Sequence, residues 1–137
     1  SEGDYSYAAL RATKECVIAI PSVKLAKQVI AVGNTHGGGG GEDGRSVVAN
    51  KFQAFGLTPA PASLVSPPLI AECFANLECR VIETRLVSKY NLFIFEVIKA
   101  WITPPHTAQK HPPTIHHRGY GVFVVDGKTI RLKSRMR

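Results

Sequence analysis

The amino-acid sequence predicts a mainly β protein with short helices, an α+β chain in which antiparallel strands curve into a small barrel. Three observations indicate this class. Residues 71–81 and 91–102 alternate in side-chain character over lengths typical of half-buried antiparallel strands. Asp126-Gly127, between two apolar runs, is typical of a tight hairpin turn. Helices and strands do not alternate as a parallel Rossmann sheet requires, which favours a barrel with local connections.

The first half of the chain contains the predicted helices. A short helix is expected over residues 5–14, and a strand is expected over residues 15–20. A second helix begins at the N-cap Ser22 and ends at Gly33, which is expected to adopt a left-handed conformation. The five consecutive glycines at positions 37–41 then predict a loop with large backbone freedom.

The predicted strands follow a third helix. Ser46 is expected to cap this helix and Gly56 to close it. Residues 58–68 are rich in proline, alanine and serine and predict an irregular connector to the long strands. Near the end of the chain, residues 119–125 and 128–132 are expected to pair as a hairpin around the Asp-Gly turn.

Length and composition predict one globular domain spanning residues 1–137. Hydrophobic residues make up 45% of the chain and charged residues 20%, as in soluble proteins. No apolar run approaches the roughly 20 residues that a membrane-spanning helix needs. The first residues lack the basic start and apolar centre of a secretory signal. We therefore expect a cytoplasmic protein that does not act in a membrane.

The formal net charge is +7, and much of the excess lies at the end of the chain. A basic tail can bind a polyanion, but here no aromatic residue is interleaved with it to stack on bases. A solvated terminus is the simpler interpretation, and nucleic acid is not the expected partner. The basic residues within the last ten positions are Lys128, Arg131, Lys133, Arg135 and Arg137.

Neither the cysteines nor the histidines predict a metal site. The three cysteines form no Cys-x-x-Cys motif, and their odd number is typical of a reducing compartment, so we expect them to pack as apolar residues. The clustered histidines have no acidic or cysteine partner beside them, and adjacent histidines on a strand point to opposite faces. These residues are Cys16, Cys73 and Cys79, and His106, His111, His116 and His117.

A series of segments in a defined order gives the chain a recognisable pattern. They are Tyr-Ser at 5–6, Glu-Cys-Val-Ile-Ala-Ile-Pro-Ser-Val-x-Leu-Ala at 15–26, Gly-Asn-Thr at 33–35, Lys-Phe-x-Ala-Phe-Gly-Leu-Thr-Pro at 51–59, Pro-Leu-Ile-Ala-Glu-Cys-x-Ala-Asn-Leu-Glu-Cys-Arg at 68–80, Tyr-Asn-Leu-Phe at 90–93 and His-His-Arg-Gly-Tyr-Gly at 116–121. This order closely resembles the flavin reductase-like family, which includes flavoredoxin. The resemblance implies an FMN-binding split β-barrel.

The chain departs from this family in two places. Family members usually begin with strands that precede the position of Ser1, so the resemblance implies a barrel that is incomplete at the N-terminus. They also have a short segment between Gly-Asn-Thr and Lys-Phe, where this chain carries the glycine-rich insertion. The loop beside the flavin is therefore expected to be longer than in the family.

Two segments are candidate FMN-binding sites. Ser1, Tyr5 and Ser6 precede or begin a helix, whose first N–H groups and hydroxyls can bind a phosphate, and the resemblance implies that this segment lies near the FMN phosphate. Helix capping is the alternative role. Asn34 and Thr35 belong to the Gly-Asn-Thr loop that lines the flavin in the family. Ordinary turn chemistry is the alternative there.

Lys51 is the candidate catalytic residue. A cation beside the flavin stabilises the anionic reduced ring and raises its potential, and the resemblance implies that Lys51 occupies this position. The alternative is a solvated helix lysine. His117 and Tyr120 are further cofactor-binding candidates, because the resemblance implies that their segment meets the flavin or the dimer partner.

The resemblance implies an FMN-dependent oxidoreductase with NAD(P)H as electron donor. Its partners would be a flavin, a nicotinamide nucleotide, an electron-acceptor protein and a second copy in a homodimer. One alternative is a flavin-carrying electron-transfer protein that does not oxidise nicotinamide directly. The other is a basic binding module without enzymatic activity.

Overall fold

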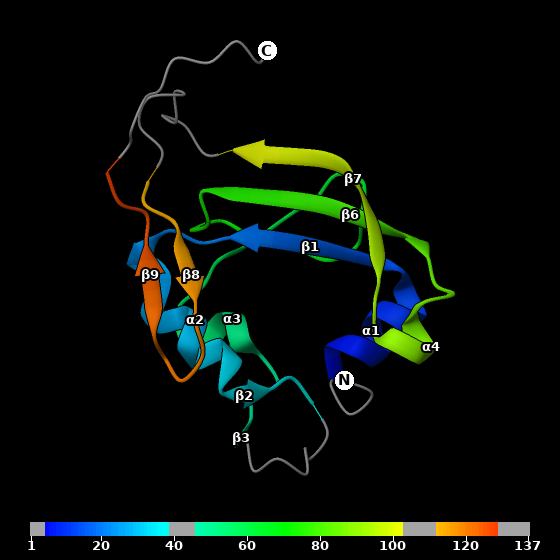
Figure 1. Ribbon diagram of the computed structural model, residues 1–137, viewed down its shortest axis with the longest axis horizontal. Coiled ribbons are helices and arrows are strands. Elements are labelled where there is room, and N and C mark those ends of the chain that lie inside the picture. Colours follow the sequence, from blue (N-terminus) through cyan, green and yellow to red (C-terminus); the bar gives the residue numbers. More distant parts are fainter. Residues whose placement is uncertain (1–4, 39–45, 103–111, 129–137) are drawn as a thin grey trace.

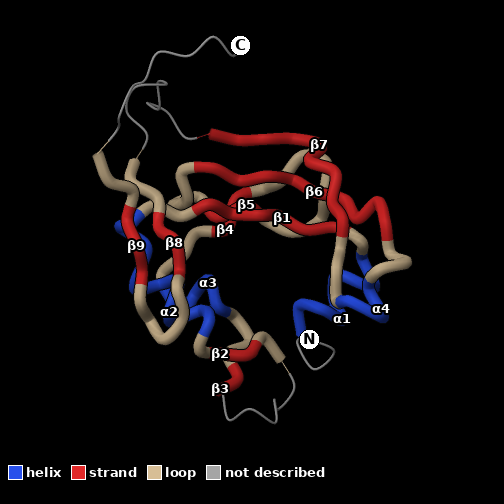
Figure 2. Tube along the Cα trace, viewed as in Figure 1, coloured by secondary structure: helices blue, strands red, loops and turns tan. Residues whose placement is uncertain are grey.

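The computed structural model describes residues 5–38, 46–102 and 112–128 (Figure 1). A three-stranded antiparallel sheet in the order β1-β6-β7 is its largest element. Figures 1 and 2 show this sheet along one side, α1 and α4 at one end of it, and α2, α3 and the β8–β9 hairpin at the other. The prediction of a mainly β fold with short helices is confirmed. The strands are β1 (Glu15–Ile20), β2 (Thr35–His36), β3 (Ser46–Val47), β4 (Pro59–Ala60), β5 (Leu69–Ile70), β6 (Ala75–Glu83), β7 (Ile94–Ile102), β8 (Ile115–His117) and β9 (Phe123–Val125).

Two helix boundaries differ from the sequence prediction: the end of α2 and the start of α3. Gly33 lies inside α2, and the helix ends at Asn34 with φ −84°, so the predicted left-handed glycine is wrong. The third helix does not begin at Ser46, because Ser46 pairs with Thr35 in a short parallel bridge. It begins where the Asn50 side chain accepts a hydrogen bond from the Gln53 N–H. The helical elements are α1 (Tyr5–Thr13), a 3-10 turn (Val23–Leu25), α2 (Ala26–Gly33), α3 (Lys51–Phe55) and α4 (Val87–Tyr90).

Strand β6 begins later than predicted. The side chain of Asn76 accepts a hydrogen bond from the Ile70 N–H at 3.0 Å and donates one to the Ile70 C=O at 3.1 Å. These bonds hold a turn at residues 71–74, so the extended run expected from residue 71 is broken. Leu69 and Ile70 instead pair with β4, which gives the connector a short ladder of its own.

The alternation of residues 71–81 places Glu78 among the polar side chains of its strand, yet it is fully buried. Its carboxylate accepts hydrogen bonds from the Ser63 N–H at 3.0 Å, the Leu64 N–H at 2.6 Å and the Trp101 Nε1–H at 2.6 Å. Burial alone would raise the pKa of Glu78, but the bonds from Ser63, Trp101 and Leu64 and the nearby charge of Lys99 outweigh it and lower that pKa. The connector is thereby tied to β6 and β7 through one carboxylate.

The described part of the chain contains a hairpin that precedes the predicted Asp126-Gly127 turn. Strands β8 and β9 pair around a turn in which Gly119, Tyr120 and Gly121 all have positive φ. Asp126 is not in that turn: its carboxylate accepts hydrogen bonds from Thr114 and lies 3.1 Å from His116 Nε2. Asp126 therefore closes the open end of the hairpin. The predicted partner strand at 128–132 falls almost entirely outside the described residues.

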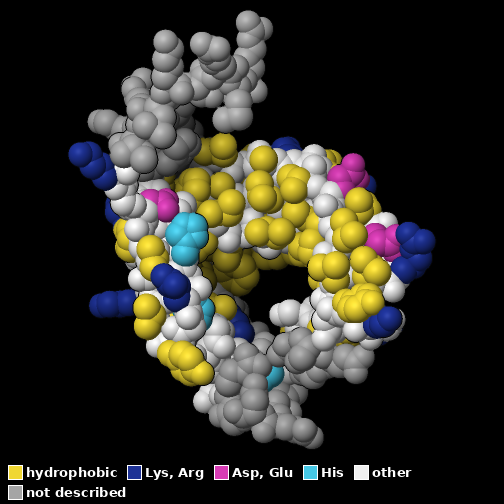
Figure 3. All heavy atoms as spheres, in the orientation of Figure 1, with side chains coloured by type: hydrophobic (Ala, Val, Ile, Leu, Met, Phe, Trp, Pro, Cys, Tyr) yellow, Lys and Arg dark blue, Asp and Glu magenta, His cyan; other side chains and the backbone are white. Residues whose placement is uncertain are grey.

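The described strands do not close into a barrel. Figure 3 shows hydrophobic side chains spread over the sheet and around a central opening. Cys73 and Cys79 are buried, as predicted for apolar packing, whereas Val97 and Ile102 on β7 are more than half exposed. Among the described helices, none has the length and apolar character needed to cross a membrane.

We predict that Glu78→Gln lowers the melting temperature more than Glu96→Gln, a change at an exposed carboxylate on β7. Glutamine has one acceptor oxygen, so its amide N–H would face at least one of the buried donors. Because the pKa of Glu78 is lowered on folding, its carboxylate stabilises the protein above the unfolded value of 4.5, and this contribution is lost as the pH falls through the folded value. Circular dichroism melts at neutral and acidic pH measure both effects. Equal melting temperatures for the two variants at neutral pH would contradict this role.

Candidate functional site

A cavity of about 320 Å³ lies where α1, α2, β2 and α3 meet. It brings together four residues that the sequence analysis singled out, although they are up to 46 positions apart: Tyr5, Ser6, Thr35 and Lys51. The rest of its lining consists of Val32, Gly33, His36 and Gly37. The cavity therefore joins the first turn of one helix, the end of another and the first residue of a third.

Lys51 enters the cavity from the start of α3. Its ammonium donates hydrogen bonds to the Val32 C=O at 2.9 Å and to the Thr35 C=O at 2.5 Å. Carbonyls at a helix C-terminus carry partial negative charge, so a cation there is favourable. Lys51 is thus half-buried and bonded to the protein rather than a solvated helix lysine, which excludes the alternative role considered from the sequence.

The Gly-Asn-Thr segment forms the end of α2. The Asn34 N–H donates to the Ile30 C=O at 2.9 Å, and the Thr35 hydroxyl donates to the Val32 C=O at 3.1 Å. Thr35 lines the cavity, whereas Asn34 is exposed beside it and is not part of the lining. The segment therefore combines the end of a helix with part of the wall of a cavity.

Tyr5 explains why glycines follow His36. A Cβ atom placed on Gly37 or on Gly38 would lie 3.2 Å from a carbon of the Tyr5 ring, closer than such contacts usually are. The first glycines of the insertion therefore let the loop pack flat against this ring. Ser6 lies beside Tyr5 in the first turn of α1. Ser1, the remaining candidate in this segment, lies outside the described residues.

His117 and Tyr120 do not line this cavity. Both belong to the β8–β9 hairpin, where the His117 ring lies 5.0 Å from that of Phe123 and Tyr120 is fully exposed. No group of three or more metal-binding side chains is found within the described ranges, and His106 and His111 fall outside them. Of the eight cofactor-binding candidates, four therefore line the cavity, Asn34 lies beside it, two belong to the hairpin, and Ser1 is outside the described residues.

The sequence analysis missed His36. This residue is 5% exposed and lines the cavity next to Thr35, and its C=O accepts a hydrogen bond from the Val48 N–H at 2.7 Å. The signal in the sequence was its place directly after Gly-Asn-Thr. A parallel bridge of two residues between β2 and β3 buries it, and so short a bridge leaves no periodic pattern to detect.

The cavity offers one cation, hydroxyl groups and an aromatic ring. Its volume is near the lower limit of about 300 Å³ for small-molecule pockets, so it accommodates the polar part of a larger ligand rather than all of it. A phosphate or the polar edge of a flat ring matches these groups, because ammonium and hydroxyl donors bind anionic and carbonyl oxygens. The donor set therefore fits part of a flavin nucleotide.

Comparisons with known proteins support this interpretation. A family model described as "Flavin reductase like domain" matches residues 1–122. An FMN-binding domain of a flavin reductases-like enzyme from Shewanella baltica superposes with a TM-score of 0.79 at 23% identity, covering 97% of this chain and 71% of that one. Flavoredoxin of Desulfovibrio vulgaris superposes with a TM-score of 0.71 at 19% identity, covering 96% and 69%. The split-barrel fold implied by the sequence is confirmed.

Two archaeal relatives have no assigned function. A protein from Archaeoglobus fulgidus is 31% identical over 94 residues, which are 69% of this chain and 48% of that protein. One from Pyrococcus abyssi is 30% identical over 84 residues, which are 61% of this chain and 42% of that protein. The chain therefore matches about half the length of these curated relatives.

We predict that Lys51→Met destabilises the protein by on the order of 1–2 kcal/mol, because it removes charge-assisted hydrogen bonds to the Val32 and Thr35 carbonyls. Lys27→Met, at an exposed position of α2, is the matched control and should change stability little. Urea unfolding of both variants measures the difference. Equal stability of the two variants would show that the hydrogen bonds of Lys51 do not contribute to the free energy of unfolding.

Proposed function

Because this chain belongs to the flavin reductase-like domain family, we propose that it binds FMN and acts as an NAD(P)H-dependent flavin reductase. The observation that carries the proposal is the convergence of Tyr5, Ser6, Thr35 and Lys51 on one cavity. These residues come from three segments of the chain, and the family resemblance made each of them a flavin-contact candidate. Their convergence supports a common ligand.

Each part of the cavity has a role in this proposal. Ser6 and the first N–H groups of α1 bind the phosphate, because donors at a helix N-terminus favour an anion. Ser1 is a further phosphate contact on the family resemblance alone. Tyr5 covers the same end of the cavity. Thr35 and Asn34 bind the ribityl chain and the ring edge, which need polar partners.

Lys51 supplies the positive charge in the proposed mechanism. FMN, when bound, would carry electrons from the nicotinamide to the acceptor. Lys51 holds a fixed ammonium at the cavity, and such a preorganised charge favours a nearby group that becomes negative on reduction. Its bonds to the Val32 and Thr35 carbonyls fix its position. Lys51 is thus the residue proposed as catalytic.

The size of the cavity supports a homodimer. About 320 Å³ accommodates only part of FMN, so the ring needs further walls. We propose that a second copy of the chain provides them, together with His117 and Tyr120 of the exposed hairpin. Exposed apolar residues of the sheet, including Trp101, give such an interface hydrophobic area. A cytoplasmic location belongs to the same proposal.

A second candidate function is electron transfer without direct nicotinamide oxidation. The structural similarity to a protein named flavoredoxin favours it. In this case an electron-transfer protein, not NAD(P)H, reduces the bound flavin. The residues of the cavity would keep the same roles, since both functions need a bound and tuned FMN.

The visible absorbance spectrum of the purified protein distinguishes these functions. We expect yellow protein, or colourless protein that becomes yellow with added FMN, and bleaching by NADH or NADPH without oxygen. Bleaching only by a reduced partner protein would support the electron-transfer function. A protein that stays colourless with excess FMN would contradict both, and would favour the basic binding module.

We predict that Lys51→Met lowers both the reduction potential of bound FMN and the rate of NAD(P)H oxidation, because the fixed positive charge is lost. Lys27→Met should leave both values unchanged. Spectroelectrochemistry and anaerobic stopped-flow absorbance measure them. If Lys51→Met weakens FMN binding but leaves the potential of the remaining bound FMN unchanged, Lys51 acts only by positioning the Gly-Asn-Thr segment, and its proposed catalytic role is wrong.

A further inference from the structure

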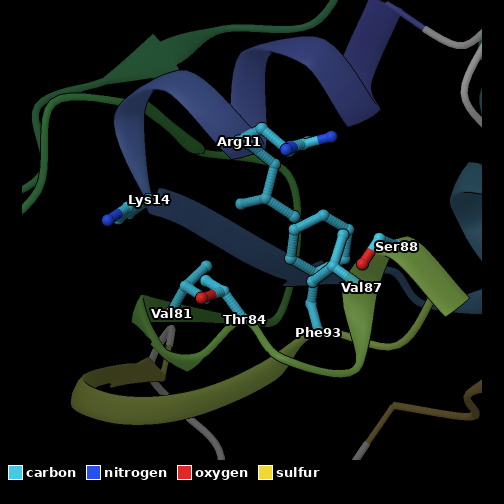
Figure 4. A pocket seen from close by; sticks show the side chains of 8 residues that line it. Arg11, Lys14, Val81, Thr84, Val87, Ser88 and Phe93 are labelled. Carbon is cyan, nitrogen blue, oxygen red and sulfur yellow. The ribbon is translucent and has the colours of Figure 1, made fainter. Parts of the chain in front are cut away.

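A second cavity, of about 250 Å³, lies at the other end of α1 and shares no residue with the cavity around Lys51. Helix α1 provides one wall, and the end of β6, α4 and the start of β7 provide the others (Figure 4). Nothing in the proposed flavin chemistry uses this cavity. Its lining consists of Leu10, Arg11, Lys14, Val81, Thr84, Val87, Ser88 and Phe93.

The floor of this cavity is apolar. Figure 4 shows Phe93 and Val87 at its centre, below Arg11. The Phe93 ring makes an edge-to-face contact with the Tyr7 ring, and the two ring centres are 5.7 Å apart. A buried valine and a fixed aromatic ring form a surface on which a small apolar or flat group can pack.

The rim of this cavity carries positive charge from Arg11 and Lys14. Within the described part of the chain, neither Arg11 nor Lys14 forms a salt bridge. The nearby carboxylate of Glu83 is already bonded to Arg85 at 2.6 Å. The C-terminus of α1 provides only about half a negative charge, so two full cations leave the rim positive.

Two hydroxyl groups complete the rim. Thr84 and Ser88 line the cavity, and Figure 4 shows the Ser88 oxygen near Val87 on the side of Arg11. Arg11 is held in place by its contact with Tyr7, whose hydroxyl it approaches to 3.5 Å and whose ring centre lies 5.8 Å from its guanidinium carbon. A guanidinium with a neighbouring hydroxyl is a donor set suited to carboxylate oxygens.

We propose that this cavity binds a small monocarboxylate whose body is a single apolar ring. The guanidinium of Arg11, assisted by the Ser88 hydroxyl, binds the carboxylate, and Phe93 and Val87 pack against the ring. A volume below the roughly 300 Å³ typical of drug-sized ligands restricts the occupant to one ring. Such a ligand would bind independently of FMN.

Titration of the ¹⁵N-labelled protein with sodium benzoate tests this site. We expect saturable shifts of the amide signals of Arg11, Val87 and Ser88, and binding at least about tenfold tighter than that of benzyl alcohol, which lacks the charge. Acetate and inorganic phosphate, which lack the ring, should also bind at least about tenfold more weakly. Equal binding of benzoate and benzyl alcohol, or of benzoate and phosphate, would overturn the proposal.

Variants assign the binding to the named residues. Arg11→Gln should weaken benzoate binding by about tenfold or more, and Lys27→Gln, at an exposed position of α2 outside the cavity, should not change it. If Arg11→Gln does not fold, Ser88→Ala, which removes the hydroxyl donor, should still weaken binding severalfold. Unchanged affinity in the folded variant, or the same loss in Lys27→Gln, would overturn the proposal. FMN binding, measured in parallel, should be unaffected in both.

Discussion

The buried carboxylate of Glu78 is the interaction on which the arrangement of the other elements depends. It lies at the centre of the only three-stranded sheet in the described part of the chain and satisfies donors from both the connector and β7. Lys99 strengthens this centre, because its ammonium lies 4.1 Å from the Trp101 ring centre and donates to the Ser63 hydroxyl at 2.8 Å. A carboxylate with several donors can hold an irregular segment that has few backbone bonds of its own.

The connector links this centre to the candidate flavin site. It runs from Thr58, just after α3, back to the sheet, and the Glu72 carboxylate accepts a hydrogen bond from the Thr58 N–H at 3.0 Å. With its connector fixed, α3 packs on α2 and Lys51 reaches the carbonyls of Val32 and Thr35. Although the glycine-rich insertion lies between α2 and α3, Lys51 of α3 therefore still contacts the end of α2. Helix α1 then has a cavity at each end, one at Tyr5 and one at Arg11.

The sequence predicted which strands and helices form better than it predicted where they begin and end. Alternation found β6 and β7, but it could not show that Asn76 would bind Ile70 and shorten the strand, because a side chain replaces ladder bonds there. Alternation also placed Glu78 on the more polar face of its strand and could not show its burial, because burial of a carboxylate depends on donors distant in sequence. At the site, Tyr5, Ser6, Thr35 and Lys51 followed from the family resemblance. Their convergence, and the burial of His36, required the structure.

Mapping of FMN onto the protein by amide chemical shifts tests the central claim most directly. The account predicts that added FMN shifts the signals of Tyr5, Ser6, Thr35, His36 and Lys51 together, with one affinity, because these residues line a single cavity. Signals of the second cavity, such as those of Val87 and Ser88, should not move. Saturable FMN shifts confined to the sheet, the hairpin or the second cavity, with the Lys51 cavity unchanged, would contradict the account.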